Sequence, residues 1–269
     1  MKTKFDYEAK IWGENKIEPS PFYIQGLKLR YLLEDLKDKK GKILDVGCGG
    51  GNIAKAVKKY RPDLEVYGVD VSKNAIQTAS KNPQGVQFKL GSSDKLPYKN
   101  NSFDIVCMFD VLEHVDENIA LGEVKRILKK DGIFHIFLPL DGQPGTLNYF
   151  LYNLGWESKN KQTGHIKIYS DKNAVRLFIE NGFRLIKKRF SFHFFFSLFD
   201  VSYFTFLDII GKKAPASIEG MIMTKRGSVL VFLFNLLYRV VVAAGYFESV
   251  LLKNVPGSGG HYTLVKKND

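Results

Sequence analysis

The chain has 269 residues, about 1.8 times a domain of roughly 150 residues, which fits one enlarged domain or one domain with a substantial insertion. Apolar residues make up 45% and charged residues 25%, a globular composition that excludes a collagen, a disordered chain and a disulfide-rich scaffold. Forty Lys and Arg against 28 Asp and Glu leave a net charge of +12, which favours nucleic acid, an anionic membrane surface or phosphorylated substrates as partners.

The two cysteines, Cys48 and Cys107, cannot form a disulfide framework and lack the spacing of metal ligands. We therefore expect a reducing compartment, and we predict no metal site. The first residues lack the apolar stretch of a signal peptide, which predicts a cytoplasmic protein that is made without export.

An amphipathic helix is predicted over residues 20–39, ahead of the first strand. Residues 41–139 then alternate short β-branched runs with helical patterns, which is typical of a parallel sheet with helices on both faces. The predicted strands are residues 42–47, 64–70, 86–91, 103–109 and 132–138. The predicted helices between them are residues 52–61, 72–80 and 117–130.

Two further strands are predicted near the C-terminus. Ser170 is a candidate N-cap for a helix that Gly182 ends. A strand over residues 183–194 follows, in which Phe190 and Phe194 share a face with Phe192. The last strand begins at His261.

A glycine-rich motif, Asp-Val-Gly-Cys-Gly-Gly-Gly, occupies residues 45–51 between a predicted strand and a predicted helix. Glycines at alternate positions let the backbone turn sharply and approach a ligand, and the helix supplies unpaired N–H groups. Asn52 replaces the third glycine of the dinucleotide fingerprint, and the carboxylate of Asp45 would repel a pyrophosphate. The motif predicts a nucleotide-type pocket for a ligand with a cationic centre and no phosphate.

Asp70 ends the second predicted strand, where its carboxylate can accept hydrogen bonds from both ribose hydroxyls. With the motif at residues 45–51, it resembles the class I S-adenosylmethionine-dependent methyltransferases. Residues 91–115 and 127–139 resemble the small-molecule, type 11 branch, which includes ubiquinone and menaquinone methyltransferases. The resemblance covers residues 4–189. It implies a Rossmann-like α/β sheet, mostly parallel with an antiparallel last strand, and S-adenosylmethionine as the cofactor.

The resemblance also implies which residues bind the cofactor: Asp45, Gly47, Cys48, Gly49, Gly51, Asp70, Val71, Ser92, Ser93, Asp94 and Phe109. In that branch an acid usually follows the glycine of the third strand and holds the adenine amino group. Here Ser92 has that place and Asp94 comes two residues later, so adenine binding is predicted only for residues 92–94 as a group.

Two histidines are candidate catalytic residues, because a base is needed when the acceptor must lose a proton. His114 follows the fourth strand, and His165 lies where the family often has a histidine. A packing role stays open for both. Tyr7, Trp12 and Tyr23 are candidates for capping the pocket, or they are surface aromatics with no such role.

Residues 109–112, Phe-Asp-Val-Leu, stand where methyltransferases acting on amino groups of bases have Asn or Asp followed by Pro-Pro-aromatic. This difference favours oxygen or carbon of a small molecule as the acceptor. Two alternatives remain: an RNA methyltransferase, which the charge permits, and a non-catalytic S-adenosylmethionine-binding or membrane scaffold protein.

Residues 195–256 are predicted to be a mainly helical, apolar insertion between the last two strands. It is a membrane-embedded hairpin or interfacial helix, a lid for a lipophilic substrate, or an extra helix packed on the core or on a second copy. Arg239 disfavours a simple transmembrane span, since insertion would cost about 2.5 to 3.5 kcal/mol. The apolar insertion favours a lipophilic acceptor such as a quinone, an isoprenoid or a lipid-linked precursor.

Basic residues flank these apolar stretches, which favours an anionic membrane on the inner face of the cell over nucleic acid. They are Lys187, Lys188, Arg189, Lys212, Lys213, Lys225, Arg226 and Lys253. The predicted organisation is an N-terminal helical cap over residues 1–40, a methyltransferase core over 41–194, the insertion over 195–256 and a final core strand over 257–269.

Overall fold

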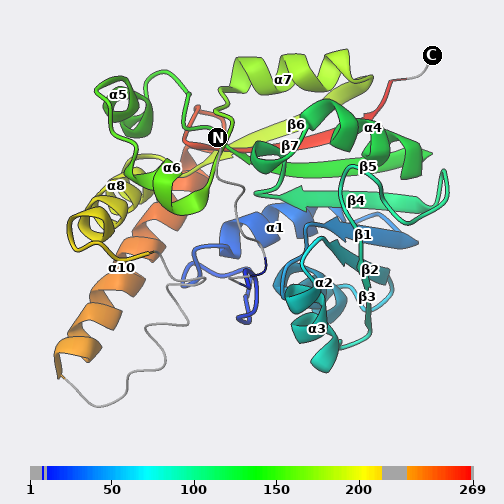
Figure 1. The fold of residues 1–269 in the computed structure, drawn as a ribbon, viewed down its shortest axis with the longest axis horizontal. Helices are drawn as coiled ribbons and strands as arrows, with labels where there is room; N and C mark the ends of the chain where they lie inside the picture. The colour runs from blue at the N-terminus through cyan, green and yellow to red at the C-terminus, as the bar shows by residue number, and fades with distance from the viewer. Residues whose placement is uncertain (1–7, 9–10, 214–228, 268–269) are drawn as a thin grey trace.

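The structure is a computed structural model that describes the chain except for residues 1–7, 9–10, 214–228 and 268–269 (Figure 1). Seven strands form one sheet in the order β3-β2-β1-β4-β5-β7-β6. They are β1 Lys42–Val46, β2 Glu65–Asp70, β3 Val86–Leu90, β4 Phe103–Phe109, β5 Leu128–Pro139, β6 Phe183–Ser191 and β7 Gly259–Lys266. β7 runs antiparallel to β5 and β6, and the other neighbours are parallel. The predicted Rossmann-like α/β fold is confirmed.

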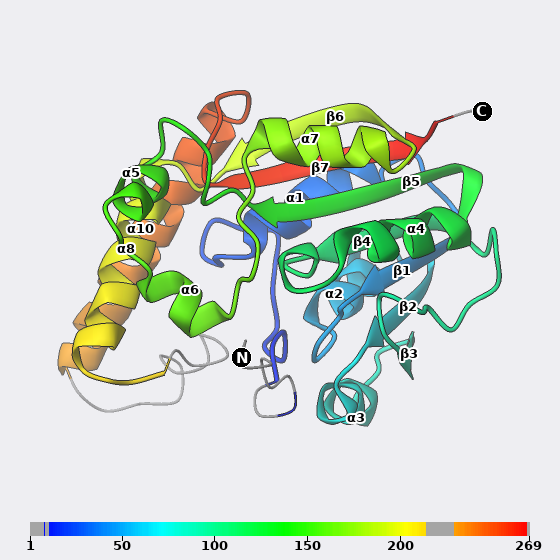
Figure 2. The ribbon, with the colours of Figure 1, turned by 45° about the horizontal axis from the view of Figure 1, so that its top comes forward.

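Helices cover both faces of the sheet (Figure 2). Along the chain they are α1 Gly26–Asp35, α2 Asn52–Tyr60, α3 Lys73–Lys81, the 3₁₀ turn η1 Leu112–His114, α4 Glu117–Ile127, α5 Leu147–Asn153, α6 Ser158–Thr163, α7 Asp171–Glu180, α8 Phe194–Ile209 and α10 Val229–Leu251. Buried side chains of α1 and α2 share one apolar core with the sheet, and those of α4 and α7 share the other. Burial on both faces explains why the central strands are continuous apolar runs rather than alternating ones.

Several predicted boundaries differ from the structure: α1 is shorter than the helix predicted over residues 20–39, and β5 and β7 begin earlier than predicted. Two further differences have a clear physical reason. α4 ends at Ile127 rather than at residue 130, because Leu128 takes an extended conformation and pairs with Phe103 of β4. β6 ends at Ser191, because Phe192 has φ +57° and turns the chain into α8. Phe194 is therefore 58% exposed on α8 and does not share a face with the buried Phe190.

The apolar stretch after β6 forms α8 and α10, which pack against each other beside the sheet (Figures 1 and 2). Phe196 of α8 is buried in one cluster with Tyr238 and Val242 of α10. Farther along α10, Tyr246 packs on Leu27 of α1. Within the described residues, no helix combines the length and apolar character that are needed to span a membrane.

The basic residues predicted to border this region do not form one surface. Arg189 is 3% exposed, and its guanidinium lies 2.9 Å from Glu34 and 2.6 Å from Asp35. Lys187 also pairs with Asp35, and Lys188 pairs with an acid of α7. Exposed beside α8 or α10 are Lys212, Lys213 and Lys253, while Lys225 and Arg226 lie outside the described residues. The prediction that all eight residues face an anionic surface is therefore wrong for Arg189, because its charge is neutralised inside the protein.

Candidate active site

A cavity of about 630 Å³ lies at the carboxyl ends of β1, β2 and β4, the edge at which parallel sheets bind ligands. Ten of the eleven residues predicted to bind the cofactor line it: Asp45, Gly47, Cys48, Gly49, Asp70, Val71, Ser92, Ser93, Asp94 and Phe109. Gly51 is not among the lining residues. It precedes α2 with φ +85°, and a Cβ atom there would lie 2.5 Å from the ring of Phe88, so its role is to permit the turn.

The glycine loop has little space for side chains. Gly47 has φ +74°, and a Cβ atom there would lie 2.3 Å from Cγ2 of Val111. On the other side of the loop, the N–H of Gly50 donates to the carbonyl of Trp12 at 2.7 Å. The N–H of Asn52 donates to the carbonyl of Gly13 at 3.0 Å. The N-terminal segment therefore crosses the loop and holds it against the cavity.

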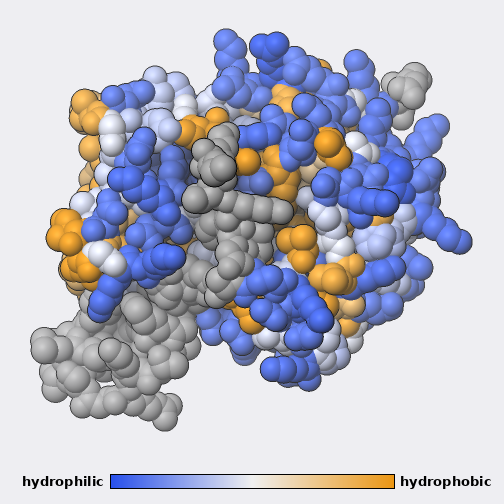
Figure 3. All heavy atoms as spheres, viewed as in Figure 1, coloured by the Kyte–Doolittle hydropathy of each residue, from blue (hydrophilic) through white to orange (hydrophobic). Residues whose placement is uncertain are grey.

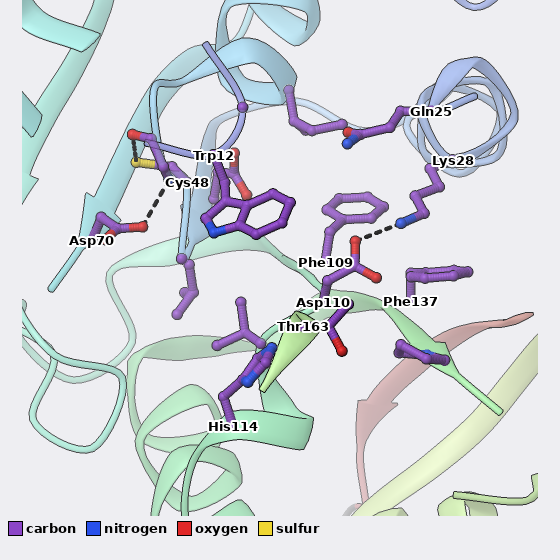
Figure 4. A pocket seen from close by; sticks show the side chains of 18 of the residues that line it. Trp12, Gln25, Lys28, Cys48, Asp70, Phe109, Asp110, His114, Phe137 and Thr163 are labelled. Atoms are coloured by element: carbon purple, nitrogen blue, oxygen red, sulfur yellow. Dashed lines mark hydrogen bonds and ion pairs between the residues drawn. The ribbon is translucent and has the colours of Figure 1, made fainter. Parts of the chain in front are cut away.

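Of the aromatic residues predicted to cap the pocket, Trp12 lines the cavity, and its side chain lies between the end of β2 and Phe109 (Figure 4). Tyr23 is not among the lining residues, and Tyr7 lies outside the described residues. The capping role is thus available to one of the three.

Asp70 is fixed by backbone N–H groups. Its Oδ2 accepts from Gly49 at 2.7 Å and its Oδ1 from Ser72 at 2.9 Å. Burial raises the pKa of Asp70, and these two hydrogen bonds oppose that shift. Because each carboxylate oxygen has a second lone pair, Asp70 can still accept hydrogen bonds from two ligand hydroxyls.

Asp45 lines the same cavity with a carboxyl group that is 3% exposed. Its Oδ1 accepts a weak hydrogen bond from the thiol of Cys107 at 3.7 Å. Its Oδ2 has no hydrogen-bond partner among the described residues. Burial, and then the nearby charge of Asp70, raises the pKa of Asp45 to about 7. A buried carboxylate with an unsatisfied oxygen fits a cationic ligand.

Lys28 closes the opposite side of the cavity (Figure 4). Its ammonium forms an ion pair with Asp110 and lies 3.8 Å from the centre of the Phe137 ring. Asp110 has φ +53°, directly after β4. Farther along this wall the cavity is lined by aromatic side chains from the end of β6 and from α8: Phe192, Phe196, Phe199 and Phe204.

The two predicted histidines both line the cavity, with ring centres 5.2 Å apart. Nδ1 of His114 lies 3.2 Å from the carbonyl oxygen of Gly164. Burial, and then the neighbouring His165, lowers the pKa of His114 to about 4, so this imidazole is neutral at pH 7. Nδ1 of His165 lies 3.6 Å from Oδ2 of Asp141.

Three charged residues beside the histidines were missed by sequence reasoning: Glu113, Asp141 and Lys159. Burial raises the pKa of Glu113, which is fully buried, to about 7. Burial alone would raise the pKa of Asp141, but the ammonium of Lys159 at 2.9 Å and His165 hold it well below its usual range. Asp141 could have been found as an acid two residues beyond the end of β5, at the ligand-binding edge of the sheet. Nothing local to Lys159 marks it, since the chain between β5 and α6 brings it into place.

The chain is similar to known methyltransferases in sequence and to solved structures in fold. A family model described as a methyltransferase domain matches residues 44–136. Protein MJ1252 of Methanocaldococcus jannaschii is 31% identical over 180 residues, which cover 65% of this chain and 61% of that protein. The ubiquinone biosynthesis O-methyltransferase of Pelagibacter ubique is 30% identical over 150 residues, covering 49% of this chain and 61% of the relative. The chain therefore spans less than two thirds of the length of these curated relatives.

Solved structures agree on the fold. YcgJ of Bacillus subtilis aligns with a TM-score of 0.57 at 20% identity, over 90% of this chain and 99% of that one. The [4+2]-cyclase SpnF aligns with a TM-score of 0.59 at 17% identity, over 97% of this chain and 87% of that one. Since one of these neighbours is named a cyclase, the fold by itself does not determine the reaction.

The family match covers β1 to β5 and includes Asp45, Gly47, Gly49 and Asp70 of the cavity. Residues 44–136 therefore belong to a class I S-adenosylmethionine-dependent methyltransferase domain of the type 11 branch. The methyltransferase cavity fits this cofactor, because Asp45 offers an unsatisfied buried carboxylate oxygen to its cationic groups and Asp70 offers acceptors for its ribose. When bound, the cofactor supplies an activated methyl group.

Proposed function

We propose that this protein transfers a methyl group from S-adenosylmethionine to oxygen or carbon of a small, lipophilic acceptor of the quinone, isoprenoid or lipid-linked class. The observation that carries the proposal is the aromatic wall of the cavity, which begins where the cofactor side ends. A methyl donor needs an acceptor aligned with it and shielded from water. Apolar rings offer such shielding to an apolar acceptor at no desolvation cost.

The names of the relatives point in the same direction. Besides the Pelagibacter protein, a demethylmenaquinone methyltransferase of Thermotoga maritima is 33% identical over 92 residues, 34% of this chain and 40% of the relative. Both relatives are named for quinone chemistry. Their shared region supports a quinone-like acceptor for this chain.

We assign His165 as the base that accepts a proton from the acceptor's reacting atom, with His114 beside it. Both rings line the cavity, and the carboxylate of Asp141 faces Nδ1 of His165. An imidazole in this place can accept a proton from an acceptor hydroxyl as the methyl group arrives. His165→Ala should bind the cofactor as tightly as the wild type does, and it should lose turnover by about 10²–10⁴-fold.

The experiment that tests the reaction is transfer of a labelled methyl group from S-adenosylmethionine into two extracts, one of lipids and one of aqueous metabolites. We expect label in the lipid extract with the wild type and little label with His165→Ala. Label that enters only aqueous metabolites contradicts the lipophilic acceptor. Label that enters only added RNA contradicts the small-molecule acceptor.

We also propose that the acceptor comes from a membrane. In this proposal α8 and α10, which belong to the insertion over residues 195–256, contact the surface of an anionic membrane without crossing it. Ile209 of α8 and Leu237 of α10 are 77% and 61% exposed, which is more than a packed helix requires. Figure 3 shows hydrophobic side chains at the edge of the molecule where α8 ends. The exposed Lys212 and Lys213 follow directly and suit anionic lipid headgroups. A lipophilic acceptor would then reach the aromatic wall from the bilayer surface.

A further inference from the structure

Glu113, His114 and His165 meet on the η1 side of the cavity. One ligand-type atom from each of the three lies within 4.8 Å of the others. Glu113 has no exposed surface, and neither of its carboxylate oxygens accepts a hydrogen bond from any described residue. Methyl transfer from S-adenosylmethionine gives no reason for a buried, unsatisfied carboxylate at this place. A charge of this kind is normally compensated by a partner cation or by a metal ion.

The two histidines are oriented in the same way with respect to this carboxylate. The carbonyl of Gly164 can only accept a hydrogen bond, so Nδ1 of His114 carries the proton and its Nε2 carries a lone pair. That Nε2 lies 4.0 Å from Oε1 of Glu113. In His165, Nδ1 faces Asp141 and Nε2 lies 3.8 Å from the same Oε1. Metal-binding histidines are held in this manner, with one ring nitrogen on a carbonyl or carboxylate and the other on the ion.

We propose that Glu113, His114 and His165 bind a divalent transition-metal cation. In a tetrahedral site with bonds of about 2.0–2.1 Å, ligand atoms are about 3.3 Å apart. The Nε2–Oε1 separations of 3.8 and 4.0 Å exceed that value by less than about 1 Å, which side-chain rotation can close. Two imidazoles with one carboxylate suit zinc, manganese or iron better than magnesium or calcium.

Asp141 is a positioning residue in this site rather than a ligand. Its Oδ1 is bonded to Lys159 at 2.9 Å and to Asn148 at 3.1 Å, and its Oδ2 faces His165. The ammonium of Lys159 is shared with Asp200 at 3.1 Å. Asp141 and Asp200 therefore offset the positive charge of Lys159.

Three protein ligands leave coordination positions open, as catalytic metal sites do. Both histidines line the cavity, so the open positions face the space that we assign to the acceptor. With the cation bound, His165 would hold the ion and would not itself accept the proton; an acceptor hydroxyl on the cation would have a lowered pKa and lose its proton to water more readily. This role rests on the proposed function, whereas binding of the cation does not.

The test is titration of this whole 269-residue chain, first treated with a chelator, with Mn²⁺, followed by electron paramagnetic resonance of the free ion. We expect one Mn²⁺ per chain, displaced by Zn²⁺. Glu113→Gln and His165→Ala should each weaken binding by at least about 100-fold, and Asp141→Asn by about 10–100-fold. The matched control is Glu180→Gln, which removes an exposed carboxylate on α7 that pairs with Arg176. It should bind Mn²⁺ as the wild type does.

Binding of S-adenosylmethionine to the same samples separates this inference from the proposed function. Variants that keep cofactor binding are folded, so their loss of Mn²⁺ supports the site. The site is overturned if the wild type shows no saturable Mn²⁺ binding, or if the folded variants bind Mn²⁺ as tightly as the wild type. A wild type that binds Mn²⁺ but not S-adenosylmethionine would overturn the proposed function and leave the metal site standing.

Discussion

Asp45, which lines the cavity, and Glu113, which lies beside His114 and His165, are carboxylates whose burial does not favour folding. Each has a pKa raised to about 7 by burial, and each has at least one oxygen without a hydrogen bond among the described residues. Unsatisfied buried charge is typical of sites that become complete when a ligand binds. Ligand binding should therefore recover stability that the protein without ligands lacks.

Asp45→Asn tests this at one position. The folded pKa of about 7 lies above the unfolded value near 3.9, so the unfolded state releases this proton first. The contribution of Asp45 to the free energy of unfolding is full below about pH 4 and is lost as the pH rises to about 7. When the free energy of unfolding is measured by urea titration without cofactor, it should fall less between pH 5 and pH 8 in Asp45→Asn than in the wild type. The same variant should bind S-adenosylmethionine at least about 10-fold more weakly, since it lacks the charge that faces the cation. An identical pH dependence in both proteins would refute this assignment.

Gly47→Ala tests the glycine loop. The φ of +74° costs a non-glycine residue about 1–3 kcal/mol, and the added Cβ would also collide with Val111. We expect a lower free energy of unfolding and loss of cofactor binding, measured by urea titration and calorimetry. Gly122→Ala is the control. Nothing lies within 4 Å of a Cβ there, and in α4 the change should add about 0.5–1 kcal/mol of stability. Equal effects of the two substitutions would contradict the argument.

Among the elements, α8 and α10 carry apolar side chains on both their inner and their outer sides. Phe196, on the inner side of α8, lines the cavity. Ile209 of α8 and Leu237 of α10 are exposed on the outer side. The outward apolar side chains are the ones that the proposed membrane contact would cover.

Replacing Ile209 and Leu237 together with Asp should weaken cosedimentation with anionic vesicles at least several-fold, without changing cofactor binding. The reason is the loss of apolar contact and the addition of two charges that anionic lipids repel. Ile179→Asp on α7 is the matched control, because Ile179 is 52% exposed on a helix outside this pair. The membrane proposal fails if wild type and double variant sediment equally, or if the control loses as much binding.

The elements also show what the sequence could predict. The strands of the sheet, and the residues at their ends that line the cavity, were predictable, because apolar runs and glycine spacing are local and parallel strands end at one edge. The ends of α4 and β6 were not, because burial of Leu128 and the positive φ of Phe192 depend on tertiary packing. Asp141 alone could have been found from its place beyond β5, but its grouping with Glu113 and Lys159 could not, since the three residues come from three segments that only the fold brings together.

At the scale of the whole molecule, Glu8, Trp12 and Gly13 of the N-terminal segment contact elements on the cofactor side of the cavity. Glu8 accepts hydrogen bonds from the N–H groups of Lys73 and Asn74 at the start of α3. Trp12 and Gly13 accept from the glycine loop and the start of α2. This segment therefore contacts two helix starts that flank the site, and Trp12 itself lines the cavity.

Cofactor binding should consequently stabilise the contacts between this segment and the loop. At 100 times its dissociation constant, a ligand that binds only the folded state adds about 2.7 kcal/mol to the free energy of unfolding. When the cofactor binds, hydrogen exchange should slow at the amides of Gly50 and Asn52, whose N–H groups donate to Trp12 and Gly13. The slowing should be greater there than at the amide of Leu264 in β7, which lies far from the loop along the sheet. Slowing that is equal at all three amides would mean that the cofactor stabilises the fold globally. In that case Trp12→Ala should leave the affinity for S-adenosylmethionine unchanged. If the slowing is instead confined to Gly50 and Asn52, Trp12→Ala should bind S-adenosylmethionine more weakly than the wild type.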